Sequence, residues 1–320
     1  FADNVKTVAH FPPARHPLLY IANFEFAVAR FLRKLKPDLY LSTDAYLSLR
    51  SKTKQLAVFH DINFEHFPQD FPKIHLWHYK KFFPRYARKA TRILTVSEFS
   101  KNDICECYGI NPDKIDVAYN GANEIFTPVS EEVKTETRNK YSEGNPYFMF
   151  VGSLHPRKNL ARLFTAFDIF KKENKNNIKL VIVGEKKWWT EPIKNAYEAM
   201  THKDDVIFTG RLSAEDLHLV TASALASVYV SYFEGFGIPI VEAFKCDTPV
   251  ITSNVTSMPE VAADAALLVD PFDVNSIAEA MKKILNDDVR QGLIEKGRIR
   301  RQDFSWDKAA EGWWKCIEKI

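Results

Sequence analysis

The stretch YFMFVGSLHPRKNLARLFTAFDIFKKENKNNIKLVIVG, residues 147–184, decides the fold class of this chain. Residues 147–151 and 179–183 are short apolar runs of the length of buried strands, and residues 160–173 between them form a helical segment. Two parallel strands joined by a helix form a βαβ unit. The stretch therefore predicts an α/β domain with a parallel sheet.

The same alternation continues towards the C-terminus. Further strands are predicted at 206–209, 226–230, 249–252 and 266–269, and helices at 189–200, 214–224, 238–245, 274–285 and 289–296. About six strands are enough for a complete doubly wound, Rossmann-like sheet. The first half has four convincing strands, at 38–42, 55–60, 92–96 and 115–118. Either its domain is small and incomplete, or its opening strands precede Phe1.

These patterns divide the chain into two α/β domains. We expect an N-terminal domain at 1–127, a polar linker at 128–146 and a C-terminal domain at 147–304. A last helix, at 305–320, is expected to pack back on the N-terminal domain.

Composition excludes several classes of protein. A hydrophobic content of 46% and a charged content of 27% are typical of a soluble globular protein, and no window approaches 18 uncharged apolar residues. Four scattered cysteines are too few for a disulfide framework, and Cys105-x-Cys107 has no matching Cys/His pair at ligand spacing, so no metal site is predicted. We expect a cytoplasmic location, with attachment to the inner face of the membrane as an open alternative. A net charge of 44 − 41 = +3 does not indicate nucleic acid as a partner.

A glycine turn after the 147–151 strand carries two cations. Gly152 and Ser153 open this turn, and Arg157 and Lys158 stand near the start of the next helix. A helix N-terminus already favours anions, so two adjacent cations there suit a diphosphate. The alternative is a solvated pair of surface cations.

The strongest signal is FEGFGIPIVE, residues 233–242. Gly235 and Gly237 expose backbone N–H groups, and a proline fits the first turn of the helix that follows, so the turn predicts an anion cradle. Glu242 lies one turn inside that helix, where the two hydroxyls of a ribose would suit its carboxylate. Glu234 stands before the turn and faces the cleft, although two surface glutamates remain the alternative.

Three further features are weaker. Gly210 ends a strand and is followed closely by Leu212. His60 also follows a strand, and a lone histidine is more often structural. Residues 71–92 interleave seven cations with aromatic side chains, which suits either an anionic membrane surface or a helix that packs its aromatic side chains inward.

Taken together, the motifs resemble the GT-B glycosyltransferases of the large family 4. The resemblance covers about residues 36–310 and rests on several short motifs in the family's order. They are Lys36-Pro37-Asp38, Val58-Phe59-His60-Asp61, Thr95-Val96-Ser97-Glu98, Tyr119-Asn120-Gly121, Arg157-Lys158-Asn159, Phe208-Thr209-Gly210, Glu234 to Glu242, Thr248-Pro249-Val250, Pro259-Glu260-Val261, Asp270-Pro271 and Phe304-Ser305-Trp306.

The resemblance implies two Rossmann-like domains facing across a cleft and a role for each matched residue. Arg157 and Lys158 would hold the donor diphosphate without a metal ion, and Glu242 would bind the ribose. Glu234 and His60 would contact the transferred sugar. The backbone of residues 235–237, including Phe236, would contact the phosphates and the sugar, and Leu212 would lie by the base.

The implied activity is retaining transfer of a hexose from a nucleotide-diphosphate sugar to a glycan or lipid-linked acceptor. The run 157–160 resembles mannosyltransferases of polysaccharide assembly, which favours GDP-mannose over a UDP-sugar as donor. Two alternatives stay open: a sugar-nucleotide epimerase of the same fold, and a nucleotide-sugar-binding module with little activity. The chain departs from the family pattern in lacking the glycine-rich loop after a first strand, and in carrying Ser153 and Asp247 where some relatives have Arg and Gly.

Overall fold

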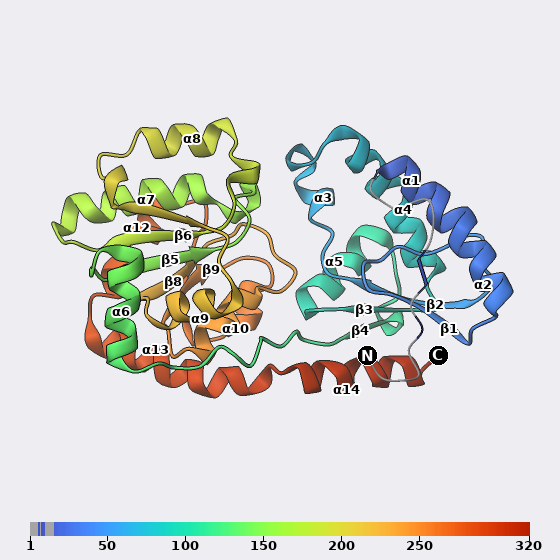
Figure 1. Ribbon diagram of the computed structural model, residues 1–320. Coiled ribbons are helices and arrows are strands. Elements are labelled where there is room, and N and C mark those ends of the chain that lie inside the picture. The colour runs from blue at the N-terminus through green and yellow to red at the C-terminus, as the bar shows by residue number, and fades with distance from the viewer. Residues whose placement is uncertain (1–5, 7, 10–15) are drawn as a thin grey trace. The chain divides into compact units, whose positions relative to one another are not determined.

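The computed structural model describes residues 6, 8–9 and 16–320, and within this range it divides the chain into two compact units (Figure 1). Unit 1 contains the described residues up to Ala118 together with Ala310–Ile320, and unit 2 contains Tyr119–Ala309. The division falls before the predicted boundary at residue 127. The predicted linker at 128–146 contains helix α6 (Glu131–Ser142), which packs on unit 2 through Tyr141. No described helix is long and apolar enough to cross a membrane.

Unit 1 is built on a parallel sheet with the strand order β1-β2-β3-β4. Its strands are β1 (Leu39–Ser42), β2 (Lys54–Phe59), β3 (Arg92–Thr95) and β4 (Ile115–Val117). Its helices are α1 (Pro17–Ala22), α2 (Ala29–Leu35), α3 (Asn63–His66), α4 (Lys73–Lys89) and α5 (Glu98–Tyr108), and a π-helical segment, Asn23–Val28, joins α1 to α2. Residues 17–35 therefore form one continuous helical segment.

The strand order explains how the sheet of unit 1 is covered. Right-handed crossovers that always step in the same direction place their helices on one face. Phe59 and Ile93 point to that face and pack with Tyr86 of α4. Val58 points to the opposite face, which the C-terminal residues cover through the buried Cys316.

Unit 2 is built on a parallel sheet with the order β10-β9-β8-β5-β6-β7. Its strands are β5 (Tyr147–Val151), β6 (Lys179–Val183), β7 (Val206–Gly210), β8 (Ala226–Tyr229), β9 (Val250–Ser253) and β10 (Ala266–Val269). Its further helices are α7 (Leu160–Asn174), α8 (Glu191–Glu198), α9 (Ala214–Ala222), α10 (Ile238–Lys245), α11 (Met258–Ala262), α12 (Val274–Lys283) and α13 (Asp287–Arg300); α14 (Trp306–Glu318) begins in unit 2 and ends in unit 1. The predicted doubly wound sheet is confirmed, and its strand order reverses between β5 and β8.

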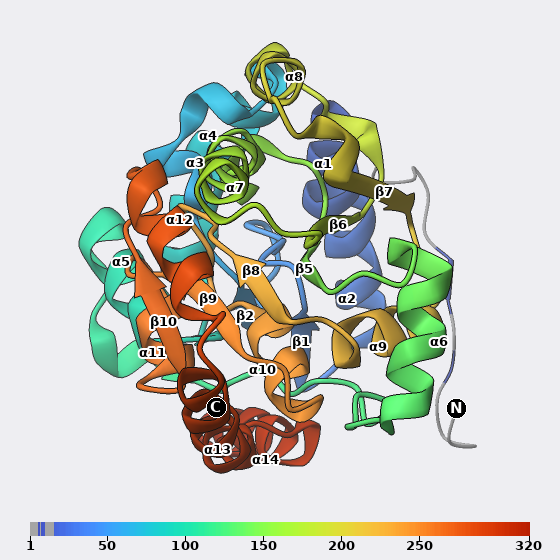
Figure 2. The ribbon, with the colours of Figure 1, turned by 90° about the vertical axis from the view of Figure 1, so that its left-hand side faces the viewer.

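Both faces of this sheet are covered, which is why its strands read as continuous apolar runs. Figure 2 shows α7 and α12 on one face and α9 and α10 on the other. Phe148 and Phe150 point towards α7 and α12, and Tyr147 and Met149 point towards Val220 of α9. The α/β class with two parallel sheets is thereby confirmed.

Asp247 has a structural role that the sequence did not reveal. Its backbone has φ = +55°, in the left-handed region that favours glycine. Its carboxylate accepts hydrogen bonds from Arg298 at 2.7 Å and Arg301 at 3.0 Å. These two charge-assisted bonds offset the cost of a side chain in this backbone conformation.

Candidate functional site

The point where the strand order reverses brings two loops of unit 2 together. Arg157 and Lys158 follow β5, and Glu234 follows β8, which is the neighbour of β5 in the sheet. In doubly wound sheets, ligands bind outside the carboxyl ends of the strands at this point. The fold therefore places the three predicted charged residues where a ligand site is expected.

A compact ion-pair cluster forms between these loops. The Glu234 carboxylate lies 2.5 Å from Arg157 Nη1 and 2.5 Å from Lys158 Nζ. Arg157 Nη1 also donates to the Phe233 carbonyl at 3.1 Å. Lys158 and Glu234 are buried, at 8% and 6% exposure, so the alternative of a solvated surface pair does not describe Lys158.

The charges of this cluster do not cancel. Burial raises the pKa of Glu234, but Lys158 and Arg157 outweigh burial and lower the pKa to about 2. Two cations and one carboxylate leave a net charge of +1 (2 − 1) on a cluster in which Lys158 and Glu234 are buried and Arg157 is partly exposed. An anion that reaches Arg157 and Lys158 would be attracted by this excess charge.

Tyr229, which the sequence did not indicate, holds Lys158 in place, and the side chain of Asn159 anchors the next position of the loop. Lys158 Nζ donates to Tyr229 Oη at 2.5 Å and lies 4.8 Å from the centre of the tyrosine ring. Asn159 Nδ2 donates to the carbonyls of Val230 at 3.0 Å and Pro271 at 2.6 Å. A hydroxyl at the end of an apolar strand is the one sequence signal that could have pointed to Tyr229.

The glycine turn that follows has the predicted geometry of a helix start. Gly237 has φ = +107°, and a Cβ there would lie 3.1 Å from Ile240 Cδ1. Pro239 lies in the first turn of α10. Ser257, another residue missed from sequence, is buried, and its single hydroxyl hydrogen is shared between the carbonyls of Glu234 at 2.9 Å and Phe236 at 3.0 Å. The turn is thus fixed from both sides.

Glu242 lies on α10 with its carboxyl group largely removed from water. Burial raises its pKa to about 7. Among the described residues, none donates a hydrogen bond to this carboxylate or forms an ion pair with it. A partly buried carboxylate without a protein donor can accept hydrogen bonds from a ligand that carries hydroxyl groups.

A cavity of about 440 Å³ opens at the ends of β5, β6 and β7. Gly152, Ser153 and Leu212 line it, together with Lys187 and Arg211. Gly210 accepts a hydrogen bond from Gly184 N at 2.9 Å at the same edge. A Cβ at Gly184 would lie 2.0 Å from the Gly152 carbonyl, so only glycine allows these strand ends to approach.

Three predicted residues are not members of the ion-pair cluster: Gly235 and Phe236, which follow Glu234 in the turn, and His60. The ring of Phe236 is buried and packs on Phe304 with centroids 5.6 Å apart. Phe236 and Gly235 can therefore contact a ligand only through backbone atoms. His60 belongs to unit 1, where it is exposed and its Nε2 lies 2.9 Å from the Thr43 carbonyl. It lines a separate cavity of about 240 Å³ with Asp61 and Phe64.

Within α4, the interleaved aromatic side chains divide into two groups. Phe82, Phe83 and Tyr86 are buried in the core of unit 1. Trp77 is 44% exposed and lies 4.9 Å from Lys81 Nζ. The helix therefore packs most of its rings inward and presents an amphipathic surface outward.

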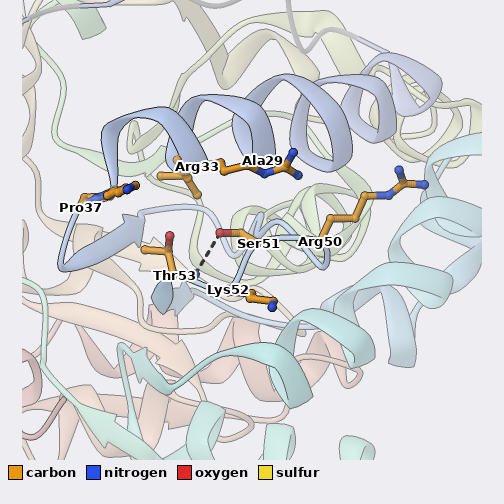
Figure 3. Close-up of a pocket in the computed structure, with 9 residues that line it drawn as sticks. Ala29, Arg33, Pro37, Arg50, Ser51, Lys52 and Thr53 are labelled. Atoms are coloured by element: carbon orange, nitrogen blue, oxygen red, sulfur yellow. Dashed lines mark hydrogen bonds between the residues drawn. The ribbon is translucent and has the colours of Figure 1, made fainter.

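Unit 1 also has a basic cavity of about 610 Å³ that the sequence did not indicate. Figure 3 shows Arg33 on α2 and Arg50 and Lys52 on the facing loop, where Ser51 Oγ accepts from Thr53 N at 3.1 Å. The cavity lies before β1 and β2, at their amino ends. Arg33 stands in the last turn of α2, where a cation stabilises the helix dipole.

Models of two families match the chain. Residues 133–300 match the family described as "Glycosyl transferases group 1". Residues 2–124 match "Glycosyltransferase Family 4".

Relatives and solved structures agree with these matches. O-antigen chain mannosyltransferase B of Escherichia coli is 32% identical over 278 residues, which are 86% of this chain and 73% of the relative. O-antigen chain mannosyltransferase RfbU of Salmonella typhimurium is 30% identical, over 83% of this chain and 70% of the relative. The structure of Anabaena HepE in complex with UDP-glucose has a TM-score of 0.77 at 18% identity and covers 92% of this chain and 82% of HepE. WaaG, a glycosyltransferase involved in lipopolysaccharide biosynthesis, has a TM-score of 0.70 at 19% identity over 86% of this chain and 76% of WaaG.

Proposed function

This chain belongs to the group 1 glycosyltransferases, and we propose that it transfers mannose from GDP-mannose to a glycan or lipid-linked acceptor with retention of configuration. The observation that carries the proposal is the ion-pair cluster of Arg157 with the buried Lys158 and Glu234 at the point where the strand order reverses. The names of the two O-antigen relatives favour mannose and a role in polysaccharide biosynthesis. HepE, which binds UDP-glucose, supports a nucleotide sugar as donor.

Each part of the donor has a chemically suitable partner in unit 2. Arg157 and Lys158 bind the diphosphate, because their net positive charge is already buried and oriented before the ligand arrives. Glu242 accepts hydrogen bonds from the ribose hydroxyls. The base occupies the cavity beside Leu212, and Glu234 contacts the transferred sugar.

The reaction proceeds by attack on the face of the sugar from which the diphosphate leaves. The acceptor oxygen bonds to the anomeric carbon as the bond to the phosphate oxygen breaks, and that oxygen takes the acceptor's proton. Glu234 does not act as a nucleophile, because Arg157 and Lys158 already hold its carboxylate. The two cations stabilise the leaving diphosphate, so this step uses no metal ion.

Substitution of the cations tests the proposal. We expect Arg157→Ala and Lys158→Ala each to lower kcat by about 10²–10³ at saturating donor. Lys172→Ala is the matched control, because this lysine is half exposed and pairs with Asp168 on α7. Near-normal turnover in both site variants, measured as release of nucleoside diphosphate, would refute the assignment.

Ligand binding separates the donor and the alternative activities. In a thermal-shift panel we expect GDP and GDP-mannose to raise the unfolding temperature more than UDP and UDP-sugars, because a ligand that binds only the folded state stabilises it. A larger shift with UDP would contradict GDP-mannose as donor. Release of nucleoside diphosphate without any acceptor would favour the epimerase, and donor affinity without turnover over many acceptors would favour the binding module.

The outer surface of α4 supports a second proposal, that the protein binds an anionic membrane surface from the cytoplasmic side. Trp77 is exposed and lies beside Lys81. A tryptophan next to a lysine suits the interface between lipid headgroups and acyl chains. We expect flotation with anionic liposomes that weakens at high salt and in Trp77→Ala. Trp314→Ala, which removes a 62% exposed tryptophan from α14, is the control. Absence of flotation at every salt concentration would exclude the proposal.

A further inference from the structure

We propose that His66, Asp103 and Cys107 of unit 1 form a zinc site. The three side chains offer one nitrogen, one oxygen and one sulfur ligand, and their ligand atoms lie within 4.8 Å of one another. This combination of imidazole, carboxylate and thiolate ligands is one that Zn²⁺ accepts, with water as the fourth ligand.

Two separate parts of the fold converge on this place. Asp103 and Cys107 are four residues apart on α5 and therefore lie on the same face of that helix. His66 is the last residue of α3, in the connection that follows β2. A metal ion here would join α3 to α5.

The distances between the ligand atoms are close to those of a tetrahedral site. Cys107 Sγ lies 3.9 Å from His66 Nε2 and 3.6 Å from Asp103 Oδ1. With zinc bonds of about 2.0–2.3 Å, ligand atoms at tetrahedral angles are about 3.3–3.6 Å apart. His66 Nε2 and Asp103 Oδ1 are hydrogen-bonded at 2.6 Å, so they would separate by roughly 0.7 Å to admit the ion.

The local charges favour a cation. Asp103, Glu65 and Glu106 interact electrostatically with Cys107 and place negative charge around it. Asp103 is itself buried, at 8% exposure. On binding of the ion, the thiol would release its proton to solvent, and the thiolate electron pair would form the Zn–S bond. The nearby cation Lys80 pairs with Glu65 at 3.7 Å.

Only one cysteine of Cys105-x-Cys107 belongs to the proposed site. Cys105 packs against the apolar core of unit 1, whereas Cys107 is exposed. His66 is 38% exposed, so the fourth position of the metal faces solvent. The ion would be structural: it would fix the connection formed by residues 60–66, in which His60 lines the cavity of about 240 Å³.

Cobalt substitution tests the site on the full chain stripped of metal with a chelator. We expect one equivalent of Co²⁺ to give a thiolate-to-cobalt charge-transfer band and the intense visible bands of tetrahedral cobalt, and Zn²⁺ to displace it. Cys107→Ser should abolish the charge-transfer band, and Cys105→Ser should keep it. His66→Gln should raise the dissociation constant for Zn²⁺ at least about tenfold, since even the loss of a group that only orients a ligand has that effect.

A second readout keeps the test independent of spectroscopy. Zn²⁺ should raise the unfolding temperature of the unsubstituted chain and of Cys105→Ser, and it should not raise that of Cys107→Ser. Circular dichroism of the metal-free variants establishes that they are folded. Loss of the band in Cys105→Ser, its persistence in Cys107→Ser, or the absence of saturable binding at one equivalent would each overturn the proposal.

Discussion

The buried carboxyl of Glu242 makes the stability of the protein depend on pH in an unusual direction. Burial raises its pKa from 4.5 to about 7. Between these two values the folded protein binds more protons at this site than the unfolded chain, so stability falls as pH rises. The effect is complete about one unit above pH 7, where the folded protein carries a largely desolvated carboxylate that no described residue neutralises.

The magnitude follows from the shift. A difference of about 2.5 pKa units corresponds to about 3 kcal/mol at full ionisation. Glu242→Gln removes the ionisation and keeps the shape of the side chain. We therefore expect the variant to gain about 3 kcal/mol over the unsubstituted protein between pH 4.5 and pH 8, which is roughly 6–12 °C in the unfolding temperature of a domain of this size.

Differential scanning calorimetry at pH 5, 6, 7 and 8 measures this gain for the transition of unit 2. Only the change with pH matters, because any constant cost of the glutamine cancels between the pH values. Glu215→Gln, on the exposed side of α9, controls for general effects of removing a carboxylate. A difference between Glu242→Gln and the unsubstituted protein that stays constant within about 1 kcal/mol from pH 5 to pH 8 would refute the reasoning.

Three further predictions concern the same site. Glu234→Gln should destabilise the protein by about 3–5 kcal/mol at pH 7, because it leaves two cations without their buried partner. The pKa of Glu234 in the folded protein, about 2, lies below the ordinary 4.5. In urea unfolding, the difference in stability between the protein and this variant should therefore shrink as pH falls from 4.5 towards 2, and it should not shrink at higher pH. Tyr229→Phe should cost about 1–3 kcal/mol in urea unfolding, because it removes a buried acceptor from Lys158; an unchanged midpoint would show that the 2.5 Å contact contributes nothing. Gly237→Ala should weaken donor binding at least about tenfold in calorimetric titration, because φ = +107° is strained for alanine and the turn must move to relieve it; an unchanged dissociation constant would contradict a role for this turn in binding.

The alternation of apolar strand and helix patterns was sufficient to predict an α/β chain with two parallel sheets. Strand length and helical spacing are local properties, so a single βαβ stretch at 147–184 reveals them. The glycine turn before α10 was also visible, because a proline in the first turn and a residue with positive φ leave a local signature at Pro239 and Gly237. The segment 128–146 was less well predicted: its polar composition suggested a linker, but the sequence Glu131–Ser142 forms a capped helix.

Only the tertiary structure decided which side chains meet. Lys158 and Glu234 are 76 residues apart, and they form an ion pair because β5 and β8 are neighbours in the sheet. His66 and Asp103 are 37 residues apart, and they meet because α3 and α5 follow the neighbouring strands β2 and β3. Cys105 is two positions from Cys107 but packs against the apolar core. Residue types and local turns can be identified from the sequence. Contacts between residues so far apart depend on the strand order and on which face of a helix is buried. The packing of the whole domain sets both.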